Sequence, residues 1–325
     1  MDRHMLNARN IALLAILILL ALLPLAVSDY WRYVFTIAFY YSIMASSWNL
    51  LAGYTGQFSM GHHTFAMIGA YTSTLLMSRA GAPFWVSIPS ALVVAALISF
   101  VLGVVCLRVY GIYLALITWA FAEVATSYVR LAYSFTGGDR GLDSPLLFGT
   151  MKPLPYYYLF LGLAVISAVL ITALMHSRIG YYLKSIREDE IAARSMGVNI
   201  TRYKILAFII ASTLAGMAGA FYGHSLGLIS PMMGNFNEMA MIIIFVVIGG
   251  MRTLSGPIAG AITVRILMDL LREYSEIRIV ILSAIVIILM RFFSGGMTEM
   301  FKRAQKLIRR GSNAPASAYD ENKSG

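Results

Sequence analysis

Long apolar stretches recur along almost the whole chain, and they limit what it can fold into more than any other feature. A helix that crosses a bilayer needs about 20 mostly apolar residues. Stretches that approach this length lie at approximately 11–27, 34–52, 62–77, 86–107, 111–131, 156–176, 205–226, 239–250, 257–271 and 279–292. Because the last three are short or broken, we expect eight to ten transmembrane helices. The sequence therefore predicts an all-α, polytopic membrane helical bundle.

The small number of charged side chains excludes a soluble enzyme. Only 12% of the 325 residues are charged and 59% are apolar, whereas soluble domains carry about 25% charged residues. The single cysteine, Cys106, lies in an apolar run, which allows neither an intrachain disulfide nor a cysteine-based metal cluster. His62, His63 and His224 are not clustered as metal ligands are, and no set of nucleophile and base stands out. We therefore expect no metal site, no redox chemistry and no enzymatic activity.

The distribution of Lys and Arg residues predicts how the chain is oriented. With ten crossing spans and a cytoplasmic N-terminus, 17 of the 25 basic residues fall on the cytoplasmic side, seven on the other side, and Arg265 within a span. Cytoplasmic loops normally hold the excess of basic residues, so both termini are expected in the cytoplasm. The net charge of +10 accordingly indicates contact with membrane lipid and not with nucleic acid.

This orientation divides the chain into three parts. Residues 1–10 form a cytoplasmic N-terminus, and residues 11–298 form the transmembrane domain. The first apolar stretch is longer than the apolar core of a typical signal peptide, so we expect it to remain as a span. Residues 299–325 are predicted to form a basic amphipathic helix at the inner leaflet, followed by a disordered cytoplasmic tail.

The segment 177–204 is the one substantial cytoplasmic connection within the transmembrane domain. A short amphipathic helix is predicted here, and Gly197 is placed to end it in the left-handed conformation. Asn199 or Thr201 can cap the helix that re-enters the membrane. The apolar side chains available to a partner are Leu183, Ile186 and Ile191. On this pattern alone, docking into a groove of a soluble partner and a solvated connection both remain open.

A group of polar residues near the end of the second span is a candidate for a translocation path. Its polar members are Asn49, Gln57, Ser59 and His62, and they surround Gly53, Gly56 and Gly61. Backbone broken by several glycines is tolerated at membrane depth only where it is buried or lines a cavity. Lining of a path and a plain cytoplasmic turn are therefore the two interpretations.

Glu123 is a second candidate for the path, because it lies about twelve residues into the fifth span. A carboxylate at this depth costs a few kcal/mol, so we expect it to be neutral, paired or in contact with a wet cavity. The residues that share its helical stripe are Trp119, Thr126 and Ser127. A path-facing Glu123 and one that is hydrogen-bonded to a neighbouring span are equally compatible with the sequence.

Four parts of the chain form a recognisable set. They are Ile186–Ala193 with Met196–Gly197 and Thr201–Lys204; Trp48–His62; Gly111–Tyr113 through Ala122–Glu123; and Gly249–Met251 with Gly256–Gly260. In this order they resemble the coupling loop, the N-terminal signature, the central signature and the late glycine-rich hairpin of permease subunits in ATP-binding-cassette (ABC) importers of branched-chain amino acids. The resemblance covers about residues 40–295 and is closer to the larger, M-type permease than to the H-type.

The resemblance implies the ABC importer permease fold and a set of residues that contact an ATPase. Coupling loops of such importers carry a Glu-Ala-Ala-x3-Gly consensus, but here Ile191 stands where the acid is expected, and Glu190 lies one place earlier. Which acid of 188–190 contacts the ATPase therefore stays open. The implied coupling residues are Arg187, Glu188, Asp189, Glu190, Ala192, Ala193 and Gly197. The candidates for the path, which rest on the residue patterns above, are Asn49, Gln57, Ser59, His62, Trp119 and Glu123.

The resemblance also implies partners: a second, H-type permease, two ABC ATPase subunits and an external solute-binding protein at the bacterial inner membrane. The chain has no Gly-x4-Gly-Lys-Ser/Thr run to hold phosphates, so we expect ATP to be hydrolysed by the partners and no cofactor to bind here. The implied solutes are leucine, isoleucine and valine, with urea or short-chain amides as an alternative. An ion-coupled secondary transporter is less favoured, because only Glu123 and Asp269 place a carboxylate at membrane depth, and Asp269 can pair with Arg265.

Overall fold

The computed structural model of the chain describes residues 3–106 and 111–272, together with single positions between 280 and 299. These residues are mostly helical, with two short strands. The elements are α1 (Arg3–Ala26), α2 (Asp29–Ala52), α3 (His62–Ala80), α4 (Phe84–Cys106), α5 (Ile112–Leu131), α6 (Tyr133–Thr136), η1 (Gly138–Arg140), β1 (Leu142–Asp143), α7 (Pro153–His176), α8 (Arg178–Glu188), α9 (Glu190–Ser195), α10 (Ile200–Leu226), β2 (Leu228–Ile229), η2 (Pro231–Gly234), α11 (Phe236–Gly249) and α12 (Gly256–Leu270).

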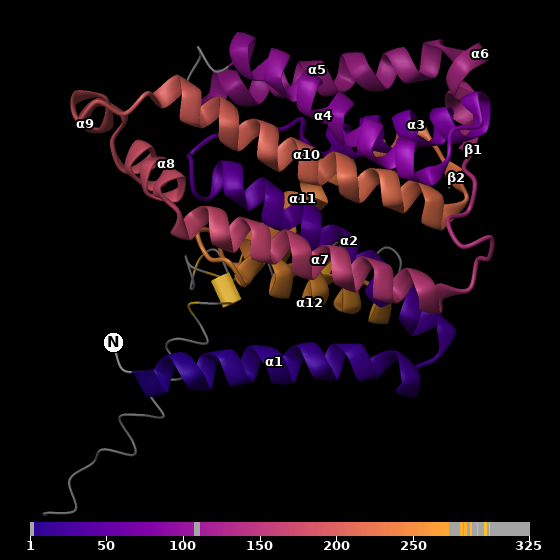
Figure 1. Cartoon of the computed structure of the whole chain (residues 1–325), viewed down its shortest axis with the longest axis horizontal. Coiled ribbons are helices and arrows are strands. Elements are labelled where there is room, and N and C mark those ends of the chain that lie inside the picture. The colour runs from indigo at the N-terminus through magenta and orange to yellow at the C-terminus, as the bar shows by residue number, and fades with distance from the viewer. Residues whose placement is uncertain are drawn as a thin grey trace, which may run out of the picture.

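The long helices lie side by side in a layered bundle (Figure 1). Helices α5 and α4 lie at one edge, α3 and α10 come next, and α7, α12 and α1 lie toward the other edge. The most extensive packing joins α10 to α3 and α4, and joins α2 to α7 and α12. One end of the bundle carries α8, α9 and the N-terminus, and the opposite end carries α6, β1 and β2. We call these the α8–α9 end and the β1–β2 end.

The predicted polytopic bundle is confirmed for the part of the chain that the structure describes. Each of the nine apolar stretches predicted before residue 272 forms a helix. Five of these helices, α2, α4, α5, α7 and α10, are long and apolar enough to cross a membrane. By contrast, α11 has 14 residues and a length of about 21 Å, which is less than the roughly 30 Å of a bilayer core. The predicted span at 279–292 and the predicted helix and tail at 299–325 lie mostly outside the described residues.

Helix ends extend beyond the apolar stretches from which they were predicted. Helix α10 begins at Ile200 and not near 205, because the side chain of Asn199 accepts a hydrogen bond from the Arg202 backbone N–H at 3.0 Å. Helix α2 likewise begins at Asp29 and not at 34. Apolar composition marks the part of a helix that lies in lipid, whereas capping residues mark where the helix begins.

Glycines allow α3 and α10 to pack backbone against backbone. A Cβ atom on Gly69 would lie 2.0 Å from the carbonyl oxygen of Gly216, and one on Gly219 would lie 2.0 Å from that of Ala66. Small residues permit this approach between helices in lipid. Beside this pair, α2 fills the centre of the bundle, where Phe39 and Trp48 are almost completely buried.

A strand pair and a small group of hydrogen bonds close the β1–β2 end. β1 pairs antiparallel with β2, with Leu142 opposite Ile229. The His224 ring binds the Pro145 carbonyl through Nδ1 at 2.8 Å and the Ser73 hydroxyl through Nε2 at 2.7 Å. Because a carbonyl only accepts, Nδ1 carries the proton and Nε2 accepts from the serine. The hydrogen bonds of His224 therefore join α3, α10 and the segment after β1.

Candidate functional site

The predicted helix in the segment 177–204 is present as two helices, α8 and α9. Asp189 separates them and caps α9, because its carboxylate accepts hydrogen bonds from the backbone N–H groups of Ile191 at 2.8 Å and Ala192 at 3.0 Å. Gly197 follows α9 with φ of +83°, the left-handed conformation that was predicted for it. Asn199 is the cap of α10, which settles the choice between Asn199 and Thr201. Local capping chemistry therefore sets the shape of this turn.

Only some of the apolar residues of the turn face outward. Ile191 is 81% exposed and Met196 is 84% exposed. The prediction that Leu183 and Ile186 are available to a partner is wrong, because both are fully buried against the membrane helices and the start of α10. Of the implied coupling residues, Ala192 and Gly197 are exposed, whereas Ala193 is buried beneath them.

The three consecutive acids of the turn have different surroundings. Asp189 caps α9, and Glu190 forms an ion pair with the largely buried Lys204 of α10. Glu188 is exposed, and its side chain forms no hydrogen bond to another described residue. Glu188 is thus the acid most accessible to a partner, and Glu190 instead ties α9 to α10.

Three segments converge beneath α8 at this end. Asn49, near the end of α2, donates from Nδ2 to the Thr253 carbonyl at 3.0 Å and accepts at Oδ1 from the Arg252 backbone N–H at 3.2 Å. Gly56 has φ of +71°, and the Cγ of Arg187 lies 3.6 Å from the place where a Cβ on Gly56 would be. Burial lowers the pKa of Arg187, and the neighbouring Arg252 lowers it further. The coupling turn is therefore in contact with the bend between α2 and α3, and Asn49 joins that bend to the hairpin between α11 and α12.

The other polar residues of this bend lie inside the subunit. The Nε2 of His62 is 2.8 Å from the Ser47 hydroxyl, and the carbonyl of Ser59 accepts from the indole of Trp48 at 2.7 Å. Gln57 is buried, and its side-chain amide has no hydrogen-bond partner among the described residues. With Asn49, these residues form an interior polar group, and the Met60 backbone N–H of the same bend donates to the Thr118 hydroxyl of α5 at 2.9 Å. Trp119 and Glu123 lie on the exposed side of α5. The role of the interior polar group in a path stays a prediction.

Helix α5 presents three different stripes along its length. One stripe is buried and consists of Leu114, Thr118, Ala122 and Thr126. At about 100° per residue, a second stripe of Trp119, Glu123, Ser127 and Arg130 lies next to it, and all four side chains are exposed. A third stripe is apolar and exposed and includes Ile117, Val124, Tyr128 and Leu131. The predicted stripe is thus corrected at Thr126, which is buried, and Arg130 joins it. The polar stripe faces neither the core nor the apolar side of the helix.

The chain returns to α5 after β2, and α11 then begins beside it. The carbonyl of Gly234 accepts hydrogen bonds from the Thr126 hydroxyl at 3.1 Å and from the His63 ring at 2.8 Å. Arg130 donates to the Asn235 side chain at 3.0 Å. The ring centroids of Trp119 and Phe236 are 6.0 Å apart. The short η2 segment between β2 and α11 is therefore held against α5, with Gly234 at the buried stripe and Asn235 and Phe236 at the polar stripe.

Glu123 is held on the exposed side of α5. Its carboxylate accepts a hydrogen bond from the indole of Trp119, one turn earlier, at 3.3 Å. Within the described residues it has no bond to a neighbouring span, so the alternative of a carboxylate buried between helices does not match the geometry of this subunit.

A further membrane carboxylate, Glu238, was not identified from the sequence. It lies in the first turn of α11 and accepts a hydrogen bond from the hydroxyl of Tyr41 at 2.7 Å. The apolar stretch that predicts this span starts at 239, which leaves Glu238 outside it. The predicted pair of Arg265 and Asp269 is confirmed, with 3.5 Å between Nη2 and Oδ1.

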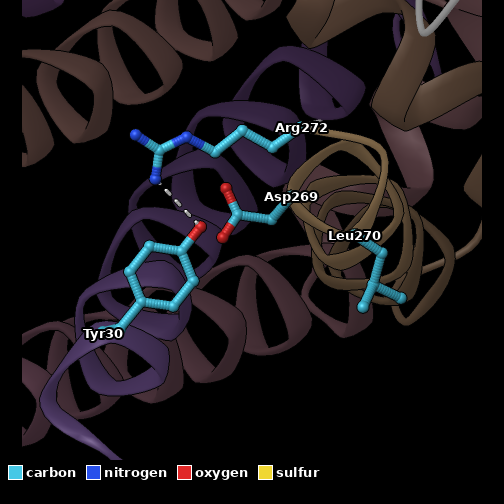
Figure 2. Close-up of a pocket in the computed structure, with 4 residues that line it drawn as sticks. All are labelled: Tyr30, Asp269, Leu270 and Arg272. Atoms are coloured by element: carbon cyan, nitrogen blue, oxygen red, sulfur yellow. Dashed lines mark hydrogen bonds between the residues drawn. The ribbon is translucent and has the colours of Figure 1, made fainter. Parts of the chain in front are cut away.

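Two cavities lie near the β1–β2 end. The larger, of about 600 Å³, is lined by Tyr30, Asp269, Leu270 and Arg272. Figure 2 shows the Arg272 guanidinium and the Asp269 carboxylate both directed toward the Tyr30 hydroxyl, and Arg272 donates to that hydroxyl at 3.3 Å. The smaller, of about 260 Å³, is lined by Tyr33, Thr36, Ile37, Met151, Pro153, Tyr156, Tyr222, Ser225 and Leu226. The larger cavity belongs to α2 and α12, away from the α5 edge of the bundle (Figure 1).

Long apolar helices, an exposed polar stripe on α5 and a capped turn at one end are features of a multi-pass membrane protein. A family described as "Branched-chain amino acid transport system / permease component" matches residues 30–294. The chain belongs to this family of inner-membrane proteins.

Individual relatives agree with this assignment. The chain is 30% identical to the high-affinity branched-chain amino acid transport system permease protein LivM of Salmonella typhimurium, over 92% of this chain and 77% of LivM. LivM of Escherichia coli gives the same identity and coverage. LivH of Escherichia coli, named as a permease protein of the same kind of system, is 24% identical over 79% of this chain and 90% of LivH. No solved structure matches the chain.

Proposed function

We propose that this chain is the M-type permease subunit of an ABC importer that carries leucine, isoleucine and valine across the bacterial inner membrane. The observation that carries the proposal is the α8–α9 turn, where Ile191 and Met196 project beside the exposed Glu188. Two exposed apolar side chains on a turn fixed by caps fit a groove on a soluble partner. The similarity to LivM supports the solute class.

The proposal assigns a partner to each surface. Two ABC ATPase subunits bind ATP, and they contact the α8–α9 end of this chain and the corresponding end of an H-type permease. This chain itself binds no cofactor and performs no catalysis. The second permease faces the polar stripe of α5, and an external solute-binding protein docks at the β1–β2 end. The excess of basic residues supports a cytoplasmic position for the α8–α9 end and for both termini.

The contacts of the turn supply a route for coupling. When the ATPases close, they displace α9, and the ion pair of Glu190 with Lys204 transmits the displacement to α10. Contact of Arg187 with the bend at Gly56 transmits it toward α2. Asn49 joins α2 to the hairpin between α11 and α12. Motion at the turn thereby reaches the end of α11, and the helix extends from there to its start beside α5.

Co-purification of the ATPase tests this proposal. The doubly substituted Ile191→Asp, Met196→Asp chain is expected to retain the second permease and lose most of the ATPase in detergent, because two carboxylates replace the apolar contacts. Met151→Asp is the matched control, since Met151 is 71% exposed but lies at the other end of the bundle. Full retention of the ATPase by the double variant would show that the turn is not the docking surface.

A further inference from the structure

We propose that the polar stripe of α5 and the start of α11 form a binding site for the zwitterionic α-amino group and carboxylate of an apolar amino acid. This inference rests on the proposed function and adds the chemistry by which the path recognises its solute. The groups that carry it are Trp119, Glu123, Arg130, Asn235 and Phe236.

The position of Glu123 on α5 makes a lipid-facing role unfavourable. A charged side chain at the middle of a bilayer costs about 2.5 to 3.5 kcal/mol on insertion scales. The apolar stripe with Val124 and Tyr128 serves as the lipid-facing side of α5. The polar stripe, beside it, therefore faces a wet space or another protein in the assembled transporter.

The site presents one acid and one base on the same side of the helix. Glu123 and Arg130 are seven residues apart, which corresponds to about 10 Å along the helix axis. Arg130 is directed toward α11 by its bond to Asn235, and it also pairs with Asp139 at 3.3 Å. A guanidinium has five N–H donors, so donors remain for a solute carboxylate. An ammonium fits Glu123, whose only hydrogen bond within the described residues comes from Trp119.

The aromatic pair supplies the apolar part of the site. Trp119 and Phe236 are each 42% exposed and pack at an interplanar angle of 60° next to Glu123. An aliphatic side chain of three or four carbons can lie on these rings while its backbone groups reach the acid and the base. Urea or a short amide has no charge to pair with either group, so the site favours an amino acid over the uncharged alternatives.

Protection of a cysteine on the stripe tests the inference in the complete purified transporter. Ser127 is exposed one turn after Glu123, and the natural Cys106 is buried. A Ser127→Cys variant is expected to react with a water-soluble maleimide, and leucine is expected to slow this reaction while urea does not. Ser134→Cys, an exposed position on α6, is the matched control and is expected to react at the same rate with and without leucine.

Charge removal identifies the groups that hold the solute. In the Ser127→Cys background, Glu123→Gln and Arg130→Gln are each expected to raise the leucine concentration for half-protection at least about tenfold. Arg178→Gln and Arg202→Gln remove exposed charges away from both α5 and the β1–β2 end and are expected to leave it unchanged. In the Ser127→Cys variant with Glu123 and Arg130 intact, leucinamide and 4-methylpentanoate are expected to protect at least about tenfold more weakly than leucine, because each lacks one of its two charges.

The outcomes separate this inference from the proposed function. Three results would overturn the site: no labelling at Ser127→Cys, no protection by leucine, or equal protection by urea. If the transporter still took up leucine with ATP, the proposed function would stand. Equal protection by leucine and by its singly charged analogues would also overturn the site. This test uses intact Glu123 and Arg130, so it holds even if the charge variants fail to assemble. Absence of leucine uptake by the complete transporter would overturn the proposed function itself.

Discussion

Single side chains join parts of this chain that are far apart in the sequence. Asn49 binds the backbone at Arg252 and Thr253, about two hundred residues away, and Tyr41 binds Glu238. The sequence marks Asn49 as a polar exception in an apolar run but does not show what it touches. Long-range pairs of this kind depend on how helices are arranged, which local patterns do not specify.

The role of Asn49 as a clamp predicts a loss of stability on its removal. Asn49→Ala removes two hydrogen bonds to part-buried backbone groups, the Thr253 carbonyl and the Arg252 N–H. At about 0.5 to 1.5 kcal/mol for each bond, the loss costs about 1 to 3 kcal/mol. We expect a lower apparent melting temperature in detergent. Asn237→Ala, at an exposed position of α11, should leave the melting temperature close to that of the unaltered chain, and equal effects of the two substitutions would argue against the clamp.

The close packing of α3 against α10 predicts that alanine destabilises the protein at Gly219 but not at an open glycine elsewhere. Gly219→Ala places a methyl group 2.0 Å from a backbone oxygen of α3, and the required shift costs about 1 to 3 kcal/mol. At Gly162 of α7 a Cβ meets nothing within 4 Å, so Gly162→Ala is expected to be neutral or to stabilise by up to about 1 kcal/mol. Thermal unfolding of both variants measures the difference, and a tolerated Gly219→Ala would contradict the close contact.

At the scale of elements, local chemistry made the α8–α9 turn predictable in shape. Gly197 and Asn199 end one helix and begin the next by short-range hydrogen bonding, so both roles follow from the sequence. The direction of the apolar residues was harder to predict. Leu183 and Ile186 belong to an amphipathic helix, and only the position of the membrane helices and α10 shows that their face is covered.

The left-handed conformation of Gly197 predicts that Gly197→Val uncouples ATP hydrolysis from solute. A β-branched residue is strained at positive φ by about 1 to 2 kcal/mol, so the end of α9 shifts while the membrane helices keep their packing. Solute-stimulated ATPase activity of the assembled transporter is expected to fall. Gly81→Val introduces the same strain at φ of +61° in a similarly open position at the other end of the bundle, and it is expected to retain stimulation; equal losses would contradict a specific role of the turn.

At the scale of the whole molecule, the apolar pattern predicted the bundle, and the arrangement of helices defined its faces. Helix boundaries for α3, α4 and α5 follow the predicted spans closely. The sequence marked Trp119 and Glu123 as path candidates, but it did not show that Asn235 and Phe236 lie beside them. That juxtaposition depends on the return of the chain through η2 after β2, and a short segment of this kind has no strong sequence signature.

The central claim is that this chain forms the path of an ATP-driven amino-acid importer. Uptake of radiolabelled leucine into proteoliposomes that contain both permeases and both ATPases, with the solute-binding protein outside and ATP inside, tests it most directly. Uptake is predicted to require ATP and this chain, to be competed by isoleucine and valine but not by urea, and to persist without a proton or sodium gradient. Leucine uptake by this chain alone, driven by an ion gradient and indifferent to ATP, would contradict the account.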